Sequence, residues 1–121
     1  MITPAFLKSC TDEQINKGVA WRLIKSRQLS GVCSAQSEID HSFSQNLAKD
    51  VDYGLFNPCT NPNDAWPIMM NNLISTTPRG RSSYAQPYAS SGMLAIMVHC
   101  DSNEELLRAA MEVYILMSTQ S

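Results

Sequence analysis

The residues best suited to recognition lie in one polar segment, from Thr77 to Tyr88. It combines arginine with tyrosine and has no lysine, aspartate or glutamate; the residues are Arg79, Arg81, Tyr84 and Tyr88. Arginine and tyrosine are enriched at protein interfaces and often dominate their energetics, and arginine beside exposed aromatics also suits single-stranded nucleic acid. Pro78 and Gly80 favour a loop over a regular element. We therefore predict a binding loop here, with a second candidate surface on the arm around Tyr53 and Phe56.

Thiols and imidazoles are the groups that could provide a nucleophile or metal ligands. They are Cys10, Cys33, Cys59, Cys100, His41 and His99. No C-x-x-C pair occurs, so neither a zinc knuckle nor a redox pair is indicated. His99 and Cys100 are neighbours in an expected strand, where adjacent side chains point to opposite faces, so the two together do not suit one metal ion. We predict inert, buried free thiols, no catalytic residues, no metal and no cofactor.

The charged side chains are explained by helix ends. Carboxylates such as Asp12, Asp64 and Glu105 fall where helices are expected to begin, and there they interact favourably with the helix dipole. The basic residues Arg22, Lys25 and Arg27 fall near an expected helix C-terminus, where the same dipole favours positive charge. No pair of carboxylates has a spacing that requires acid–base work, so we predict no general acid or base.

Two helices are marked by their starts. Thr11 and Gln14 fit a capping box that begins a helix ending near residues 26–30. Asn61 as N-cap with Pro62 at the first helical position begins another, which is expected to kink at Pro67 and to end near Asn72. Residues 34–47 have apolar side chains at every fourth position and fit either a short helix or a polar connection.

The C-terminal part predicts strands followed by a helix. Residues 73–76 and 93–100 are the expected strands, and Ser102 with Glu105 forms a second capping box. The final helix has a broad apolar face, so Leu106, Ala110, Val113 and Met117 are expected to be nearly inaccessible; the face also includes Ala109 and Leu116. The fold class is α+β: a small single domain over residues 1–121, with two to four helices packed on a short antiparallel sheet.

The composition is that of a globular domain, and its net charge is too small to produce a strong electrostatic field. Apolar residues make up 44% and charged residues 17% of 121 residues, and the formal net charge is −2. This charge gives no general attraction to nucleic acid or to an anionic membrane. The longest apolar run is far shorter than the ~20 residues that span a bilayer, and no signal peptide is recognised. We expect a cytosolic protein with no membrane partner.

Three blocks of sequence resemble one family. Residues 11–17 (Thr-Asp-Glu-Gln-Ile-Asn-Lys), residues 57–68 with the run Asp64-Ala65-Trp66-Pro67-Ile68, and residues 107–111 (Leu-Arg-Ala-Ala-Met) occur in the same order as in the small NinX-like proteins of tailed bacteriophages and prophages. The resemblance implies a phage or prophage accessory protein in the cytoplasm of a bacterial host and implies no mechanism. For Trp66 we predict a structural role, anchoring its helix to the core.

The first hypothesis for function is a non-enzymatic binding protein. It would bind a host protein and inhibit or redirect it. The target would be a bacterial defence factor, which makes the role anti-defence, or a nucleic-acid-processing factor. The residues expected to make the contact are Arg79, Arg81, Tyr84, Tyr88, Tyr53 and Phe56. The second is a nucleic-acid-binding accessory factor in phage recombination or replication. The third is a small enzyme with a cysteine nucleophile near His41 or His99. A homo-oligomer is left open.

Overall fold

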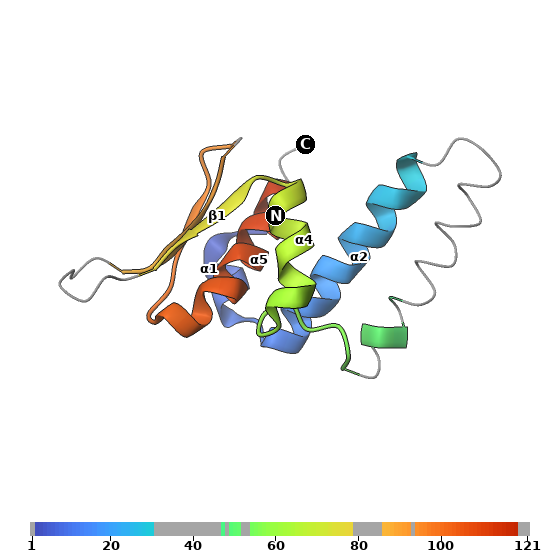
Figure 1. Cartoon of the computed structure of the whole chain (residues 1–121), viewed down its shortest axis with the longest axis horizontal. Coiled ribbons are helices and arrows are strands. Elements are labelled where there is room, and N and C mark those ends of the chain that lie inside the picture. The colour runs from blue at the N-terminus through green and yellow to red at the C-terminus, as the bar shows by residue number, and fades with distance from the viewer. Residues whose placement is uncertain are drawn as a thin grey trace.

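The computed structural model of the protein describes residues 2–30, 47, 49–51, 54–78, 86–92 and 94–118. Its helices are α1 (Pro4–Ser9), α2 (Asp12–Ser30), α4 (Pro62–Asn71) and α5 (Leu106–Ser118), with a short 3-10 helix, η1 (Asn103–Glu105), before α5. The strands are β1 (Ile74–Thr77), β2 (Tyr88–Ser91) and β3 (Met97–His99). The predicted α+β fold class is confirmed (Figure 1). The two alternatives predicted for residues 34–47, a short helix or a polar connection, fall almost entirely outside the described residues.

Helix α5 is the centre of the core. It packs against α1, α2, α4 and all three strands, and every residue from Ala109 to Leu116 is buried. The prediction that this helix is a core element is confirmed for Ala110 and Val113, which are fully inaccessible. It is wrong for Leu106 and Met117, which are partly exposed because they lie at the two ends of the helix, beyond the elements that cover its middle.

The sheet is antiparallel, with the order β1-β2-β3. Ala89 pairs with Val98, and both are buried, whereas the neighbouring pair Tyr88 and His99 points to the other face by the alternation of a strand. Tyr88 was predicted to lie in a loop, and this is wrong, because it pairs with Thr77 and His99 within the sheet. The predicted strand over residues 93–100 is shorter in the structure, because a turn closed by the bond from Ser91 N to Ile96 O precedes it.

Two predicted helix caps are confirmed and one is wrong. The Thr11 backbone N–H donates to Gln14 Oε1 (2.9 Å) and Gln14 N–H donates to Thr11 Oγ1 (3.2 Å), and Asn61 Oδ1 accepts from Asn63 N–H (3.0 Å). Ser102 makes no side-chain cap. Glu105 instead accepts from the Asp101 backbone N–H (3.2 Å), one residue earlier, and η1 separates this site from α5.

Helix α4 overturns the predicted role of Trp66. The helix buries Ala65, Ile68 and Met69, whereas Trp66 is 58% exposed. At 3.6 residues per turn, positions 65, 68 and 69 share the face toward α5, so position 66 is turned away from the core. Trp66 therefore does not anchor the helix. Within the described part of the chain, no helix has the length and apolar character needed to cross a bilayer.

Candidate functional site

Most of the predicted binding residues lie outside the described residues, namely Arg79, Arg81, Tyr84 and Tyr53. Tyr88 is half-buried on β2 with its ring centroid 5.7 Å from that of His99. Phe56 is half-buried against the core and lines a cavity of about 580 Å³ with Ile68 and Tyr114. Phe56 and Tyr88 are thus in separate places, on the arm before α4 and in the sheet, and the described part of the prediction does not form one surface.

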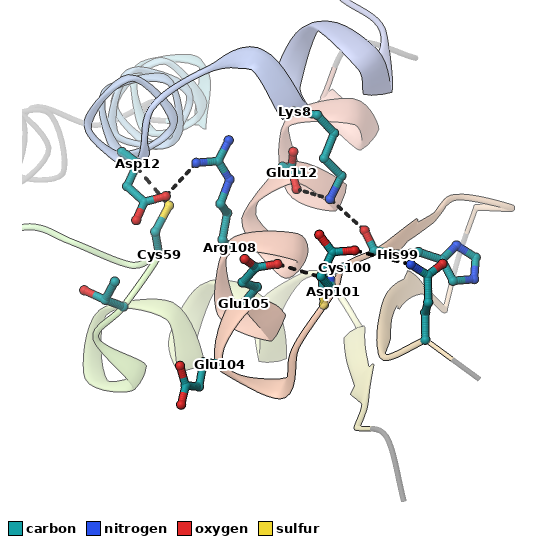
Figure 2. Close-up of a pocket in the computed structure, with 12 residues that line it drawn as sticks. Lys8, Asp12, Cys59, His99, Cys100, Asp101, Glu104, Glu105, Arg108 and Glu112 are labelled. Carbon is teal, nitrogen blue, oxygen red and sulfur yellow. Dashed lines mark hydrogen bonds and ion pairs between the residues drawn. The ribbon is translucent and has the colours of Figure 1, made fainter. Parts of the chain in front are cut away.

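A second cavity, of about 540 Å³, gathers charged side chains from distant parts of the sequence. Its walls come from α1, the start of α2, the arm before α4, the end of β3 and α5 (Figure 2). Lys8, Asp12, Arg108 and Glu112 contribute charges, and the thiols of Cys59 and Cys100 also line it. None of these residues belonged to the predicted binding set, so the structure gathers a cluster of polar side chains where the sequence had indicated only helix caps and core thiols.

Arg108 connects α5 to the turn between α1 and α2. Its Nη1 donates to Asp12 Oδ1 at 2.6 Å, and its Nη2 donates to the backbone oxygens of Leu7 (2.9 Å) and Cys10. The bond to Asp12 raises the pKa of Arg108, against the effect of burial. A guanidinium has several donors in a fixed plane, so this one side chain satisfies two carbonyls at the end of a helix together with a carboxylate.

Asn16 makes the corresponding connection between α2 and the arm before α4. It is buried, its Nδ2 donates to Asn57 Oδ1 (2.8 Å), and its Oδ1 accepts from the Cys59 backbone N–H (3.2 Å). Asp64 then accepts from the Asn57 backbone N–H (2.9 Å). We call the cluster of Asp12, Asn16, Asn57, Cys59 and Arg108 the junction. Because these residues are bonded to one another and to the backbone across the junction, their role is to hold the fold together.

Lys8 and Glu112 form the least exposed ion pair of the cavity. The Lys8 ammonium lies 3.2 Å from Glu112 Oε2 and donates to the His99 backbone oxygen at 2.6 Å. The Glu112 side chain is 1% exposed, and its Oε1 has no hydrogen-bond partner among the described residues. A signal for this residue existed in the sequence: Glu112 is the one charge within the apolar run 109–117, and a carboxylate on a core-facing helix requires a partner.

The two buried thiols, Cys59 and Cys100, are poor nucleophiles. Burial raises the pKa of Cys59 to about 12, and the nearby Asp12 carboxylate adds to this effect. Burial also raises the pKa of the Cys100 thiol. The thiolate is the reactive form of cysteine, so both groups stay protonated near neutral pH. Cys10 is partly exposed, against the prediction that the cysteines are buried.

The outward side of α4 has an apolar character. Trp66, Met70 and Leu73 are all more than half exposed. Trp66 and Met70 are four residues apart within α4, which places them along one side of the helix, and Leu73 follows the C-cap residue Asn72. Leu73 has a φ of 54°, the left-handed conformation that more often holds Gly or Asn at a helix C-terminus. We call these three residues the α4 stripe.

The family model described as Bacteriophage P22, NinX matches residues 9–118. The chain belongs to the NinX family. It is therefore a bacteriophage accessory protein, and the resemblance predicted from the three sequence blocks is confirmed. The matched range includes the whole junction and the α4 stripe. No curated protein and no solved structure matches the chain.

Proposed function

We propose that this phage accessory protein is not an enzyme and that it binds a protein of the bacterial host, which it inhibits or redirects, in the host cytoplasm. The observation that carries the proposal is the α4 stripe. Trp66 and Met70 are residue types enriched in the cores of protein interfaces, and a buried tryptophan often provides a large share of the binding energy.

The exposed side chains of the α4 stripe have little role in holding the fold together. Helix α4 packs on α5 through another side, where Ala65, Ile68 and Met69 are buried. Exposed apolar side chains that gather on one side of a helix favour burial against a partner, since removing apolar surface from water stabilises a complex by roughly 25 cal/mol per Å². An amphipathic surface of this kind suits a protein groove better than a nucleic acid, because it has no cation to pair with phosphate.

The absence of an enzymatic role is supported by the chemistry of the thiols. Cys59 and Cys100 are held in the protonated form, and Arg108 is occupied by Asp12 and two backbone carbonyls. A cysteine enzyme needs a thiolate with a base in reach. These two described thiols do not meet that requirement, and binding then remains the function that the arrangement supports best.

The test compares two equally exposed tryptophans. Trp66→Ala removes the centre of the stripe, whereas Trp21→Ala removes a tryptophan that is 56% exposed on α2. We expect a tagged protein to recover one stoichiometric host protein from a bacterial lysate, and we expect Trp66→Ala to reduce the affinity for that purified protein by about tenfold or more. Trp21→Ala should leave it within about twofold. Equal losses in both variants, or no loss in either, would contradict the proposal.

A second candidate function is nucleic-acid binding, favoured by the pair of rings on the sheet. Tyr88 and His99 project from the side away from the buried Ala89 and Val98, and aromatic rings on a sheet stack against bases. Arg79 and Arg81 precede β2 in the sequence. This candidate expects binding of a single-stranded oligonucleotide that weakens steeply with salt and is lost in the Arg79→Glu, Arg81→Glu double variant. The first proposal expects no such binding.

A further inference from the structure

One oxygen of a buried carboxylate in the charged cavity has no donor. Glu112 Oε2 is paired with Lys8, but Oε1 is buried and has no hydrogen-bond partner among the described residues. Leaving a buried acceptor of a charged group unpaired is unfavourable. Because Glu112 also lines the cavity of about 540 Å³, a group that donates N–H bonds and carries positive charge would be stabilised at this position.

The charge of the cavity wall favours the same kind of group. Five carboxylates line it, from Asp12, Asp101, Glu104, Glu105 and Glu112, against two permanent cations, Lys8 and Arg108. The wall therefore has three negative charges in excess when His99 is neutral. Both cations already have acceptors inside the protein, and a concave wall of one sign raises the local concentration of counter-ions.

We infer that this cavity binds a primary ammonium or guanidinium group, with Glu112 as the acceptor at its floor and Asp101 and Glu105 at its entrance. The inference is independent of the proposed host partner. Within the described part of the chain, no group of three His, Cys, Asp or Glu side chains is arranged to hold a metal ion, and Lys8 and Arg108 stand among the carboxylates. An organic cation with N–H donors fits that arrangement better than a bare divalent ion.

Lys8 shows how such a ligand is held. Its ammonium bonds both Glu112 Oε2 and the His99 carbonyl, and yet its side chain is 47% exposed and lies on the six-residue helix α1 (Figure 2). The Lys8 ammonium thus occupies part of the inferred cation site from the solvent side. A cation bound at Oε1 would share the carboxylate of Glu112 with the Lys8 ammonium on Oε2, and the two like charges would repel each other. The ligand and Lys8 consequently compete for Glu112.

The experiment is a titration of the full chain, labelled with ¹⁵N, with methylguanidinium chloride. We expect saturable shifts of the backbone amides at residues 99–101 and 105–112. Tetramethylammonium at the same concentration has the same charge but no N–H donor, so it should leave these signals in place. Equal shifts with tetramethylammonium, or competition by Ca²⁺, would overturn the assignment, since the first indicates an ion atmosphere and the second a metal site.

Two variants should move the affinity in opposite directions. Glu112→Gln keeps the shape of the side chain and removes its charge, so binding should weaken by about tenfold or more. Lys8→Met keeps the stem and removes the competing ammonium, so binding should strengthen by a comparable factor. The control Glu13→Gln, outside this cavity, should change nothing. If Lys8→Met binds no more tightly than the unmodified chain, the competition and the inferred site are both wrong, even where Glu112→Gln fails to fold.

The source of the cation follows from a comparison of probes. A blocked peptide, acetyl-Gly-Arg-Gly-amide, presents the guanidinium of a protein side chain, whereas agmatine, which has a guanidinium and an amine, and spermidine are small free cations. Peptide affinity at least equal to that of agmatine assigns the site to a basic side chain of a polypeptide. An affinity for agmatine or spermidine that is tenfold higher assigns it to a small amine. Binding of none of the three would overturn the inference.

Discussion

At the junction, the hydrogen bonds of Arg108 and Asn16 join elements that lie far apart in the sequence, α5 to α1 and α2, and α2 to the arm before α4. Along the α4 stripe, Trp66 and Met70 present large apolar surfaces to water, and their side chains take part in no hydrogen bond described in the structure. Both regions lie within the family match. The comparison separates residues that hold the fold together from residues whose exposure needs a partner to explain it, and it assigns stability to the first and binding to the second.

The largest difference in thermal stability should appear when the same charge is placed in the core and on the α4 stripe. Val113→Asp puts a carboxylate at a position with 0% exposure in α5. An unpaired buried charge costs several kcal/mol, so we expect no cooperative thermal transition by circular dichroism. Leu73→Asp makes the same change at a position that is 58% exposed and should keep a cooperative transition within a few degrees of the unmodified protein. A normal melt for Val113→Asp would show that α5 does not pack as described.

A smaller loss is expected at the junction. Arg108→Met keeps the apolar stem but removes the guanidinium donor from Asp12, from the Cys10 carbonyl and from the Leu7 carbonyl, which keeps the backbone N–H of Cys10. We expect a loss of about 2–3 kcal/mol in the free energy of unfolding, measured by urea denaturation. The matched change Lys17→Met removes an exposed ion pair with Glu13 and should cost less than about 0.5 kcal/mol. Similar losses for the two variants would mean that the bonds of Arg108 stabilise the fold no more than an exposed ion pair does.

The smallest effect should have the opposite sign. Leu73 holds a left-handed backbone conformation that asparagine adopts more readily than leucine. We expect Leu73→Asn to raise the free energy of unfolding by about 0.5 kcal/mol and to reduce the affinity for the host partner. This combination, a more stable protein that binds less, would sharpen the distinction between the two regions. A decrease in stability would show that the Leu73 side chain contributes to packing.

Sequence patterns predicted the elements whose signals are local. The capping box at Thr11 and the cap at Asn61 were correct because their partners lie two or three residues away. The burial of Val113 followed from helical periodicity. By contrast, strand β2 was missed, since residues 89–91 (Ala-Ser-Ser) are small side chains with little strand preference, and β1 and β3 pair with them on both sides.

The candidate site was missed for a related reason. Its contacts join residues far apart in the chain, such as Lys8 with Glu112 and Asp12 with Arg108, and no spacing in the sequence relates them. Trp66 was misjudged because residue type alone favours burial, whereas the phase of α4 is set by Ala65, Ile68 and Met69. The predicted residues Arg79, Arg81, Tyr84 and Tyr53 lie outside the described structure, and their role in binding stays a prediction.

The bonds from Arg108 to the first helix have a consequence for the order of events during synthesis. Helix α1 and the start of α2 leave the ribosome well before the side chains that hold them, Arg108 and Glu112, which lie about a hundred residues later in the chain. Until α5 emerges, the apolar faces of α2 and α4 have no core to cover them, and a nascent chain in that state is prone to aggregation. Helix α1 therefore reaches its final contacts only after α5 has been synthesised, although α1 itself is made about a hundred residues earlier.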